Sequence, residues 1–171
     1  PHFSFTRLTG ADPLPGIEMT STGEVGCLGE TLNEAFLKAI LSVGFPIHPQ
    51  KVLISAGPMK FKKGCLEYCK IFSKMGLELY ATSGTYRYLC EHQIPCHQLF
   101  WPEEGSTPVV TEAIKERSSF DLVINIPKNF QESELTNTYW IRRKAVDLGI
   151  PLITNLQLAQ QFARAIEDCE L

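Results

Sequence analysis

The sequence lacks the features that mark several common classes of binding protein. It has no run of basic residues, and its formal net charge is −3 with a pI near 5.8, which argues against nucleic acid held by general electrostatics. No apolar stretch approaches the length that spans a bilayer, and no tract is of low complexity. We therefore expect neither a nucleic-acid partner nor a membrane partner.

Motifs for nucleotide binding and catalysis are also missing. There is no GxGxxG or Walker loop, and no Ser/His/Asp or Cys/His constellation follows the predicted strands. Glu103 and Glu104 are adjacent, so their side chains would diverge in an extended chain, which does not suit paired acid–base work. We therefore predict that the chain carries no catalytic residue.

The six cysteines do not have the spacing of a secreted disulfide framework, and none forms a CxxC pair. Cys65 and Cys69 lie four residues apart on a predicted helix, and Cys90 and Cys96 follow, with two histidines nearby. A zinc site is conceivable there. We instead expect reduced, mostly buried thiols, with no metal and no cofactor in this chain.

The composition, 44% hydrophobic and 20% charged, suits one globular domain with an appendage. The chain begins Pro-His-Phe-Ser-Phe without Met, and we expect it to be an excised piece of a longer protein. The alternation of Phe3 and Phe5 predicts a strand, and apolar spacing over 30–43 predicts an amphipathic helix. A Pro-containing linker over 45–50 places the domain boundary between residues 1–45 and 46–171.

From residue 51 the sequence alternates short apolar strands with helices. This alternation predicts a Rossmann-like α/β fold, with a parallel five-stranded sheet and helices on both faces. The predicted strands cover 52–54, 77–81, 96–100, 121–125 and 151–154, and the predicted helices cover 64–75, 85–91, 109–116, 139–148 and 156–167.

Ligands of such sheets bind beyond the carboxyl ends of the strands, so the residues that follow each strand are candidates. The stretch 82–85, Thr-Ser-Gly-Thr, ends one strand and opens a helix. A helix N-terminus favours an anion, although Ser and Thr are also ordinary helix caps. Lysines after the first strand supply charge, Trp101 supplies a flat wall, and Asn125 is a buried amide that needs partners. The alternatives are a solvated lysine loop and a tryptophan that only anchors its loop.

Two parts of the chain resemble a known family. Glu18-Met-Thr-Ser-Thr-Gly-Glu-Val25 resembles the end of the second ATP-grasp unit of carbamoyl-phosphate synthase. From about residue 51 the chain resembles the C-terminal regulatory domain of that enzyme, which has the methylglyoxal-synthase-like fold. The matching strings are Ala81-Thr-Ser-Gly-Thr85, Asp121-Leu-Val-Ile-Asn125, Ile141-Arg-Arg143 and Gly149-Ile-Pro-Leu-Ile-Thr-Asn155. The resemblance implies a non-catalytic allosteric fragment of a ligase that makes carbamoyl phosphate from bicarbonate, ATP and ammonia or glutamine, with Mg or Mn used only by the parent enzyme.

The effector-binding residues that this resemblance implies are Lys60, Lys62, Thr82, Thr85, Trp101, Asn125, Lys128 and Thr138. The two threonines at 82 and 85, Trp101 and Asn125 resemble the N-acetyl-L-glutamate site of the ammonia-dependent, urea-cycle type, but Lys128 and Thr138 stand where that type has Asn. The two lysines at 60 and 62 instead resemble the pyrimidine-pathway type, which uridine nucleotides inhibit. We favour N-acetyl-L-glutamate and a mitochondrial location, because asparagines and threonines can pair its carboxylates and amide. The alternative is UTP or UMP and a cytoplasmic location.

Effector binding is expected to order residues 57–63 and 126–138 and to change how the domain docks on the ATP-grasp units of the parent chain, with residues 1–45 as the mechanical link. Two other interpretations stay open. Methylglyoxal synthase and IMP cyclohydrolase share the fold, but the loop over 102–108 lacks the aspartate that methylglyoxal synthase needs after its third strand. The other interpretation is a docking module that binds no ligand.

Overall fold

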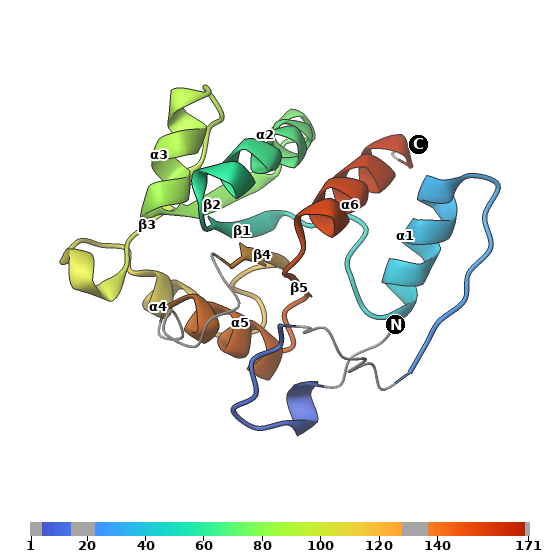
Figure 1. The fold of residues 1–171 in the computed structure, drawn as a ribbon, viewed down its shortest axis with the longest axis horizontal. Coiled ribbons are helices and arrows are strands. Elements are labelled where there is room, and N and C mark those ends of the chain that lie inside the picture. Colours follow the sequence, from blue (N-terminus) through green and yellow to red (C-terminus); the bar gives the residue numbers. More distant parts are fainter. Residues whose placement is uncertain (1–4, 15–22, 128–136, 170–171) are drawn as a thin grey trace.

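A computed structural model describes residues 5–14, 23–127 and 137–169 of the chain (Figure 1). Within these ranges, five parallel strands form one sheet in the order β3-β2-β1-β4-β5. The strands are β1 (Lys51–Ala56), β2 (Glu78–Thr82), β3 (His97–Leu99), β4 (Leu122–Ile126) and β5 (Leu152–Ile153). The run Val52-Leu53-Ile54 is fully buried, as expected of a strand that is covered on both faces. The predicted α/β fold is therefore confirmed.

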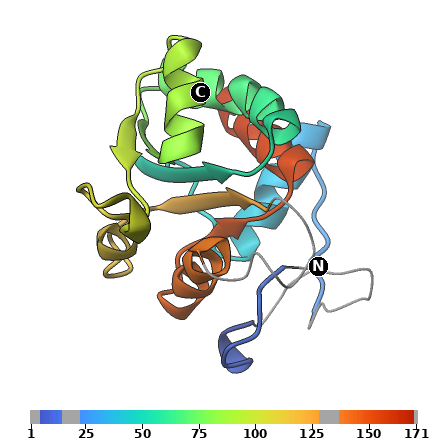
Figure 2. The same cartoon turned by 60° about the vertical axis from the view of Figure 1, so that its left-hand side comes forward.

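Helices cover both faces of the sheet (Figures 1 and 2). One face carries α1 (Leu32–Ser42), α2 (Met59–Lys74), α3 (Ser83–Glu91) and α6 (Leu156–Asp168), and the other carries α4 (Val110–Ala113) and α5 (Asn137–Asp147). Two short 3-10 helices are η1 (Phe5–Arg7) and η2 (Pro102–Glu104). Because successive side chains of a strand alternate between faces, Ile54 packs into the first core and Leu53 into the second.

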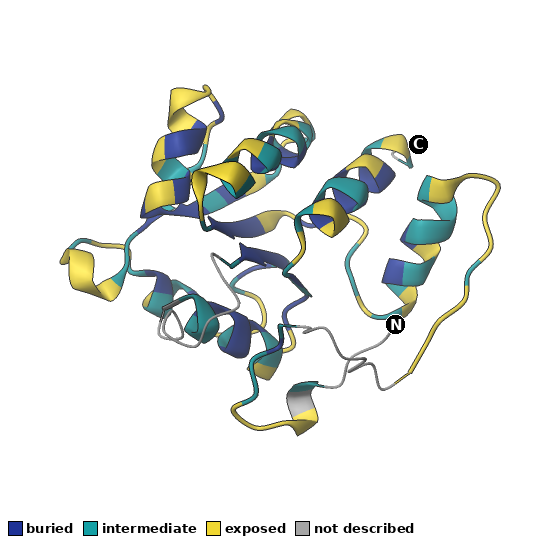
Figure 3. Cartoon of the chain, viewed as in Figure 1, coloured by how far each residue is buried: buried dark blue, intermediate teal, exposed yellow. Residues whose placement is uncertain are grey.

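The burial pattern follows these two layers (Figure 3): buried residues lie in the strands and along one side of the helices, and exposed residues lie along the other side. Helix starts and ends agree with their local sequence. Thr31 and Asn155 cap α1 and α6 by accepting hydrogen bonds from the backbone N–H groups of Glu34 and Leu158. Gly76, with φ of 81°, follows α2 in the left-handed region that glycine adopts most easily. None of the helices in the described ranges is both long enough and apolar enough to cross a membrane.

Three predictions about the elements are wrong. Phe5 does not lie in a strand: it begins η1, where Leu8 N donates to Phe5 O at 3.1 Å, while Phe3 lies outside the described residues. Helix α2 begins at Met59, five residues before its predicted start at Gly64, because its first turn is lysine-rich, with Met59 and Lys60 exposed, and shows no apolar stripe. Helix α4 ends at Ala113 rather than at residue 116.

The prediction of mostly buried thiols is correct only in part. Cys65 and Cys69 are buried in α2. The hydroxyl group of Tyr68 donates to Cys65 Sγ at 2.8 Å, and burial raises the pKa of the Cys65 thiol to about 11. Cys90 is exposed and the other three cysteines are half-buried, because they lie at helix ends and in loops.

Helix α1 packs directly against α6 and places Leu37 and Ile40 in the core that covers one face of the sheet. Asn33, also in α1, hydrogen-bonds with both Asp168 and Gln161 of α6. The boundary predicted between residues 45 and 46 therefore has extensive contacts across it, and it stays a prediction.

Candidate functional site

Three buried polar side chains form a row at the carboxyl ends of β2, β1 and β4. Thr82 Oγ1 donates to Ser55 Oγ at 3.2 Å, and Ser55 is the register partner of Asn125. Thr82, Ser55 and Asn125 are 3%, 4% and 0% exposed. They share the pleat side of Tyr80, Leu53 and Val123, which face the core under α4 and α5. The strand order reverses between β1 and β4, which is where open α/β sheets bind ligands.

The amide of Asn125 has only one of its two ends satisfied. Its Oδ1 accepts a hydrogen bond from Arg142 Nη1 at 3.0 Å, whereas its Nδ2 has no hydrogen-bond partner among the described residues. A buried donor without a partner costs about 1–3 kcal/mol, so native proteins rarely leave one without a reason. The Nδ2 group therefore indicates a site for an acceptor atom.

The N-terminus of α3 is a second feature of this edge. Thr82 is the N-cap residue of α3 but makes no side-chain cap hydrogen bond, because its hydroxyl is turned to Ser55. A methyl group added at Gly84 would lie only 3.1 Å from Lys62 Nζ, so the ammonium lies directly over the first turn of α3. A helix N-terminus is positively polarised, and a lysine beside it adds to the positive potential that favours an anion there.

Thr85 serves the fold in this structure. Its Oγ1 accepts from Ala56 N at 3.0 Å and donates to Ala56 O at 3.3 Å, which ties α3 to the end of β1. A hydroxyl has one proton, so Thr85 has none left to donate to an anion in this arrangement. Its predicted role as an effector ligand stays a prediction.

Trp101 is half-buried and packs against the core under α4 and α5. Its loop is fastened to the start of α3, because Glu104 Oε2 accepts from both Trp101 N at 2.6 Å and Ser83 Oγ at 2.5 Å. Ser83 Oγ in turn accepts from Gln98 Nε2 at 3.2 Å. The sequence suggested no role for Glu104, and the structure shows that it positions the Trp101 loop beside α3.

Three predicted site residues remain to be located. Lys60 is exposed in the first turn of α2, Thr138 is half-buried as the second residue of α5, and Lys128 lies outside the described residues. Ser55 belongs to the residues after the first strand that the sequence indicates as candidates, although it was not among the predicted effector ligands, and sequence reasoning missed Arg142 as a member of the site. Two adjacent arginines in a helix with apolar neighbours are a signal that could have found Arg142, because a buried arginine needs partners.

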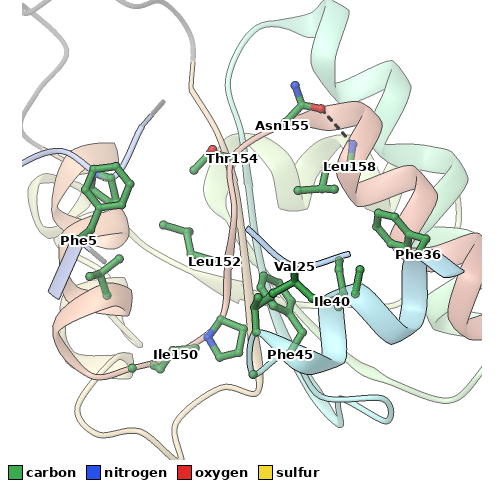
Figure 4. Close-up of a pocket in the computed structure, with 17 residues that line it drawn as sticks. Phe5, Val25, Phe36, Ile40, Phe45, Ile150, Leu152, Thr154, Asn155 and Leu158 are labelled. Atoms are coloured by element: carbon green, nitrogen blue, oxygen red, sulfur yellow. Dashed lines mark hydrogen bonds between the residues drawn. The ribbon is translucent and has the colours of Figure 1, made fainter. Parts of the chain in front are cut away.

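A separate cavity of about 640 Å³ lies between the N-terminal residues, α1 and β5 (Figure 4). Its lining includes Phe5, Ile40, Phe45 and Leu152 and, among the described residues, no charged side chain. An apolar cavity without charge does not suit a small anion. Within the described ranges, no group of three or more His, Cys, Asp or Glu side chains could hold a metal ion.

Comparison with known proteins agrees with this fold. A family model described as an MGS-like domain matches residues 64–154. The chain is 42% identical over 170 residues to the mitochondrial carbamoyl-phosphate synthase (ammonia) of Homo sapiens, covering 98% of this chain and 11% of that protein. It is 38% identical over 170 residues to the multifunctional protein pyr1-3 of Dictyostelium discoideum, covering 97% of this chain and 8% of that protein. It is 39% identical over 181 residues to the multifunctional protein CAD of Squalus acanthias, again covering 97% and 8%.

The chain thus spans about a tenth of the length of these relatives. The family match covers more than half of the chain and includes α3, α4, α5, most of α2, and the strands β2, β3, β4 and β5. The chain therefore belongs to the family of MGS-like domains.

Proposed function

We propose that this chain is the effector-binding, regulatory region of a carbamoyl-phosphate synthase. The proposal is supported by relatives of both the ammonia type and the multifunctional type, which match nearly the whole chain, and by the row of buried polar side chains at the sheet edge. The parent enzyme would make carbamoyl phosphate elsewhere in its chain. This region would bind a small molecule and change activity through its contacts with the ATP-grasp units.

The observation that carries the proposal is the unpartnered Nδ2 of Asn125. A donor in a buried position is best satisfied by a charged acceptor, because hydrogen bonds to charged groups are about twice as strong as neutral ones. N-acetyl-L-glutamate supplies two carboxylates and an amide. One carboxylate would accept from Asn125, and the N-terminus of α3 would bind the other, with Trp101 flanking the ligand and with Lys128 and Thr138 as further partners.

A second candidate ligand is a uridine nucleotide. It is favoured by the position of Lys62, whose ammonium lies over Gly84 at the start of α3. A lysine at a helix N-terminus is a typical phosphate site, and Lys60 could add charge from the first turn of α2. Binding of N-acetyl-L-glutamate would indicate that the parent enzyme serves the urea cycle or arginine synthesis in mitochondria. Binding of UTP or UMP would indicate that it serves pyrimidine synthesis in the cytoplasm.

Calorimetric titration of the chain with N-acetyl-L-glutamate, and separately with UMP and UTP, tests the proposal. Asn125→Ser removes the buried donor, and we expect a loss of about 1.5–3 kcal/mol, or about 10- to 150-fold in affinity. Asn155→Ser is the matched control, because Asn155 lies at the same sheet edge and serine can keep its cap on α6.

The lysines separate the two ligand classes. Lys62→Met is expected to abolish binding of UMP and UTP, whereas Lys63→Met, a change at the exposed neighbouring lysine, is expected to leave it intact. Heat with N-acetyl-L-glutamate that weakens in Asn125→Ser supports the first candidate. Heat only with the nucleotides supports the second, and no heat with any of them overturns the effector-binding role in favour of a docking module.

A further inference from the structure

One side of α5 holds the N-terminal segment, which we define as residues 5–13. Tyr139 Oη donates to Gly10 O at 2.6 Å, and Arg143 Nη1 donates to Ala11 O at 3.0 Å. Residues four apart lie on the same side of a helix, so these contacts form one continuous surface. Figure 2 shows the dark blue segment running beside the orange helix.

Arg142 joins this segment to the candidate site. Its Nε donates to Asp12 Oδ1 at 2.7 Å and its Nη2 to Asp12 Oδ2 at 2.5 Å, which is a bidentate pair. Its Nη1 donates to Asn125 Oδ1 at 3.0 Å. The side chain of Arg142 is 4% exposed, so these contacts replace almost all of the hydration of its charge. One buried guanidinium therefore contacts both the N-terminal segment and the amide that carries the proposed function.

The guanidinium also decides which end of the Asn125 amide faces the site. Arginine has only donors and no acceptor, so it can pair with the oxygen of the amide but not with its nitrogen. While Arg142 is in place, Oδ1 is turned to it and Nδ2 is left as a donor. Without Arg142, the amide could rotate and present its oxygen to the site, where an anion would be repelled.

We propose that Arg142 is a positioning residue that couples the N-terminal segment to effector binding: Asp12 holds the guanidinium, and the guanidinium fixes Asn125 as a donor. This inference rests on the proposed function, and it names how that site is regulated. Coupling of this kind is reciprocal. A segment that is docked through Asp12 raises the affinity for an anion, and a bound anion strengthens the docking of the segment.

The neighbouring arginine provides a matched comparison. Arg143 forms an ion pair with Asp147, with Nη2 at 2.6 Å from Oδ1, and it also contacts the N-terminal segment. None of its contacts among the described residues reaches Asn125. Asp12→Asn and Asp147→Asn are therefore the same substitution beside adjacent arginines of one helix, and only the first lies on the path to the site.

The first measurement is the affinity of each variant for N-acetyl-L-glutamate, or for UMP if that is the probe that binds. We expect Asp12→Asn to weaken binding about 5-fold or more, the low end of measured coupling energies, and Asp147→Asn to change it by less than about 2-fold. Equal affinities for the wild type and Asp12→Asn, or equal losses in the two variants, would overturn the proposal.

The second measurement needs no ligand. Hydrogen–deuterium exchange of residues 5–13 reports how firmly the segment is docked. We expect Asn125→Ser to speed this exchange about 5-fold in the wild-type background and to have no further effect in Asp12→Asn, where the connection is already broken. An exchange rate unchanged by Asn125→Ser would refute the coupling. If the wild type binds neither probe, the proposed function fails, and this double-mutant cycle alone decides whether Arg142 couples the two regions.

Discussion

Replacing Gly84 by alanine should strengthen the fold and weaken the site at the same time. Gly84 is the second residue of α3, and alanine in a helix is about 0.5–1 kcal/mol more favourable than glycine. In the first turn we expect the low end of this range. For a chain of this size, 1 kcal/mol shifts the melting temperature by about 2–4 °C, so Gly84→Ala should raise it by about 1–2 °C.

The same methyl group would stand where an anion has to bind. It would lie 3.1 Å from Lys62 Nζ, so an anion oxygen could no longer lie between the ammonium and the N–H groups of α3. Loss of one charge-assisted hydrogen bond is worth about 1.5–3 kcal/mol, which corresponds to about 10- to 150-fold in affinity. Scanning calorimetry and titration calorimetry in the same buffer measure the two effects.

Gly26→Ala is the control, because a methyl group there would meet no atom within 4 Å and Gly26 is exposed in a loop. We expect its affinity for N-acetyl-L-glutamate or UMP to equal that of the wild type. A Gly84→Ala variant that melts higher and still binds with wild-type affinity would show that the ligand does not occupy the N-terminus of α3, and the argument from Lys62 would then be wrong.

Three further predictions concern the scaffold. Thr85→Val should lower the free energy of unfolding by about 1–3 kcal/mol, because Ala56 N loses its partner; an unchanged urea midpoint would contradict this. Gly64→Ala should destabilise by about 1–3 kcal/mol, because the new methyl group would overlap Leu156 of α6; a melting temperature equal to that of the wild type would show that α2 and α6 pack differently. Burial raises the pKa of Cys65 from 9.0 to about 11, so an unfolded chain loses this proton first and stability should fall as pH rises from about 9 to about 11. Urea midpoints at about pH 7 and about pH 10 measure the fall, and a loss no smaller in Cys65→Ala would contradict the assignment.

The sheet could be predicted from the sequence because its strands are short, apolar and separated by clear helix signals. Runs such as Val52-Leu53-Ile54 have no periodicity of their own. Their regular alternation with helices nevertheless predicts a parallel sheet that is covered by helices on both faces. The first turn of α2 was missed for the opposite reason. Lys60 and Lys63 are exposed and Lys62 is half-buried, so lysines interrupt the apolar stripe that would mark the helix over 59–63.

The edge residues of the site could also be predicted, since the ends of parallel strands meet at one edge. Thr82 and Asn125 were placed correctly by that rule, which needs only the strand boundaries. The rule does not say which hydroxyl group already makes hydrogen bonds within the fold and so cannot donate to a ligand. Thr85 pairs with the backbone of Ala56, and this pairing depends on how α3 sits against β1, which no local pattern records.

The contact between Arg142 and Asp12 was beyond sequence reasoning. The two residues are 130 positions apart, one inside an amphipathic helix and the other in a loop that has no apolar periodicity. Neither residue follows a strand, so the rule that found Asn125 cannot find them. Only the three-dimensional arrangement shows that the guanidinium is shared between Asp12 and Asn125.

The most direct test of the central claim is the nuclear magnetic resonance signal of the Asn125 side-chain amide. The chain would be labelled with the heavy nitrogen isotope and titrated with N-acetyl-L-glutamate and then with UMP, and the signals would be assigned by their absence from Asn125→Ser. If a small anion accepts a hydrogen bond from Nδ2, the amide protons of Asn125 should shift downfield and saturate with the calorimetric affinity. Saturable binding that leaves these two protons unmoved would contradict the claim that this edge of the sheet is the effector site.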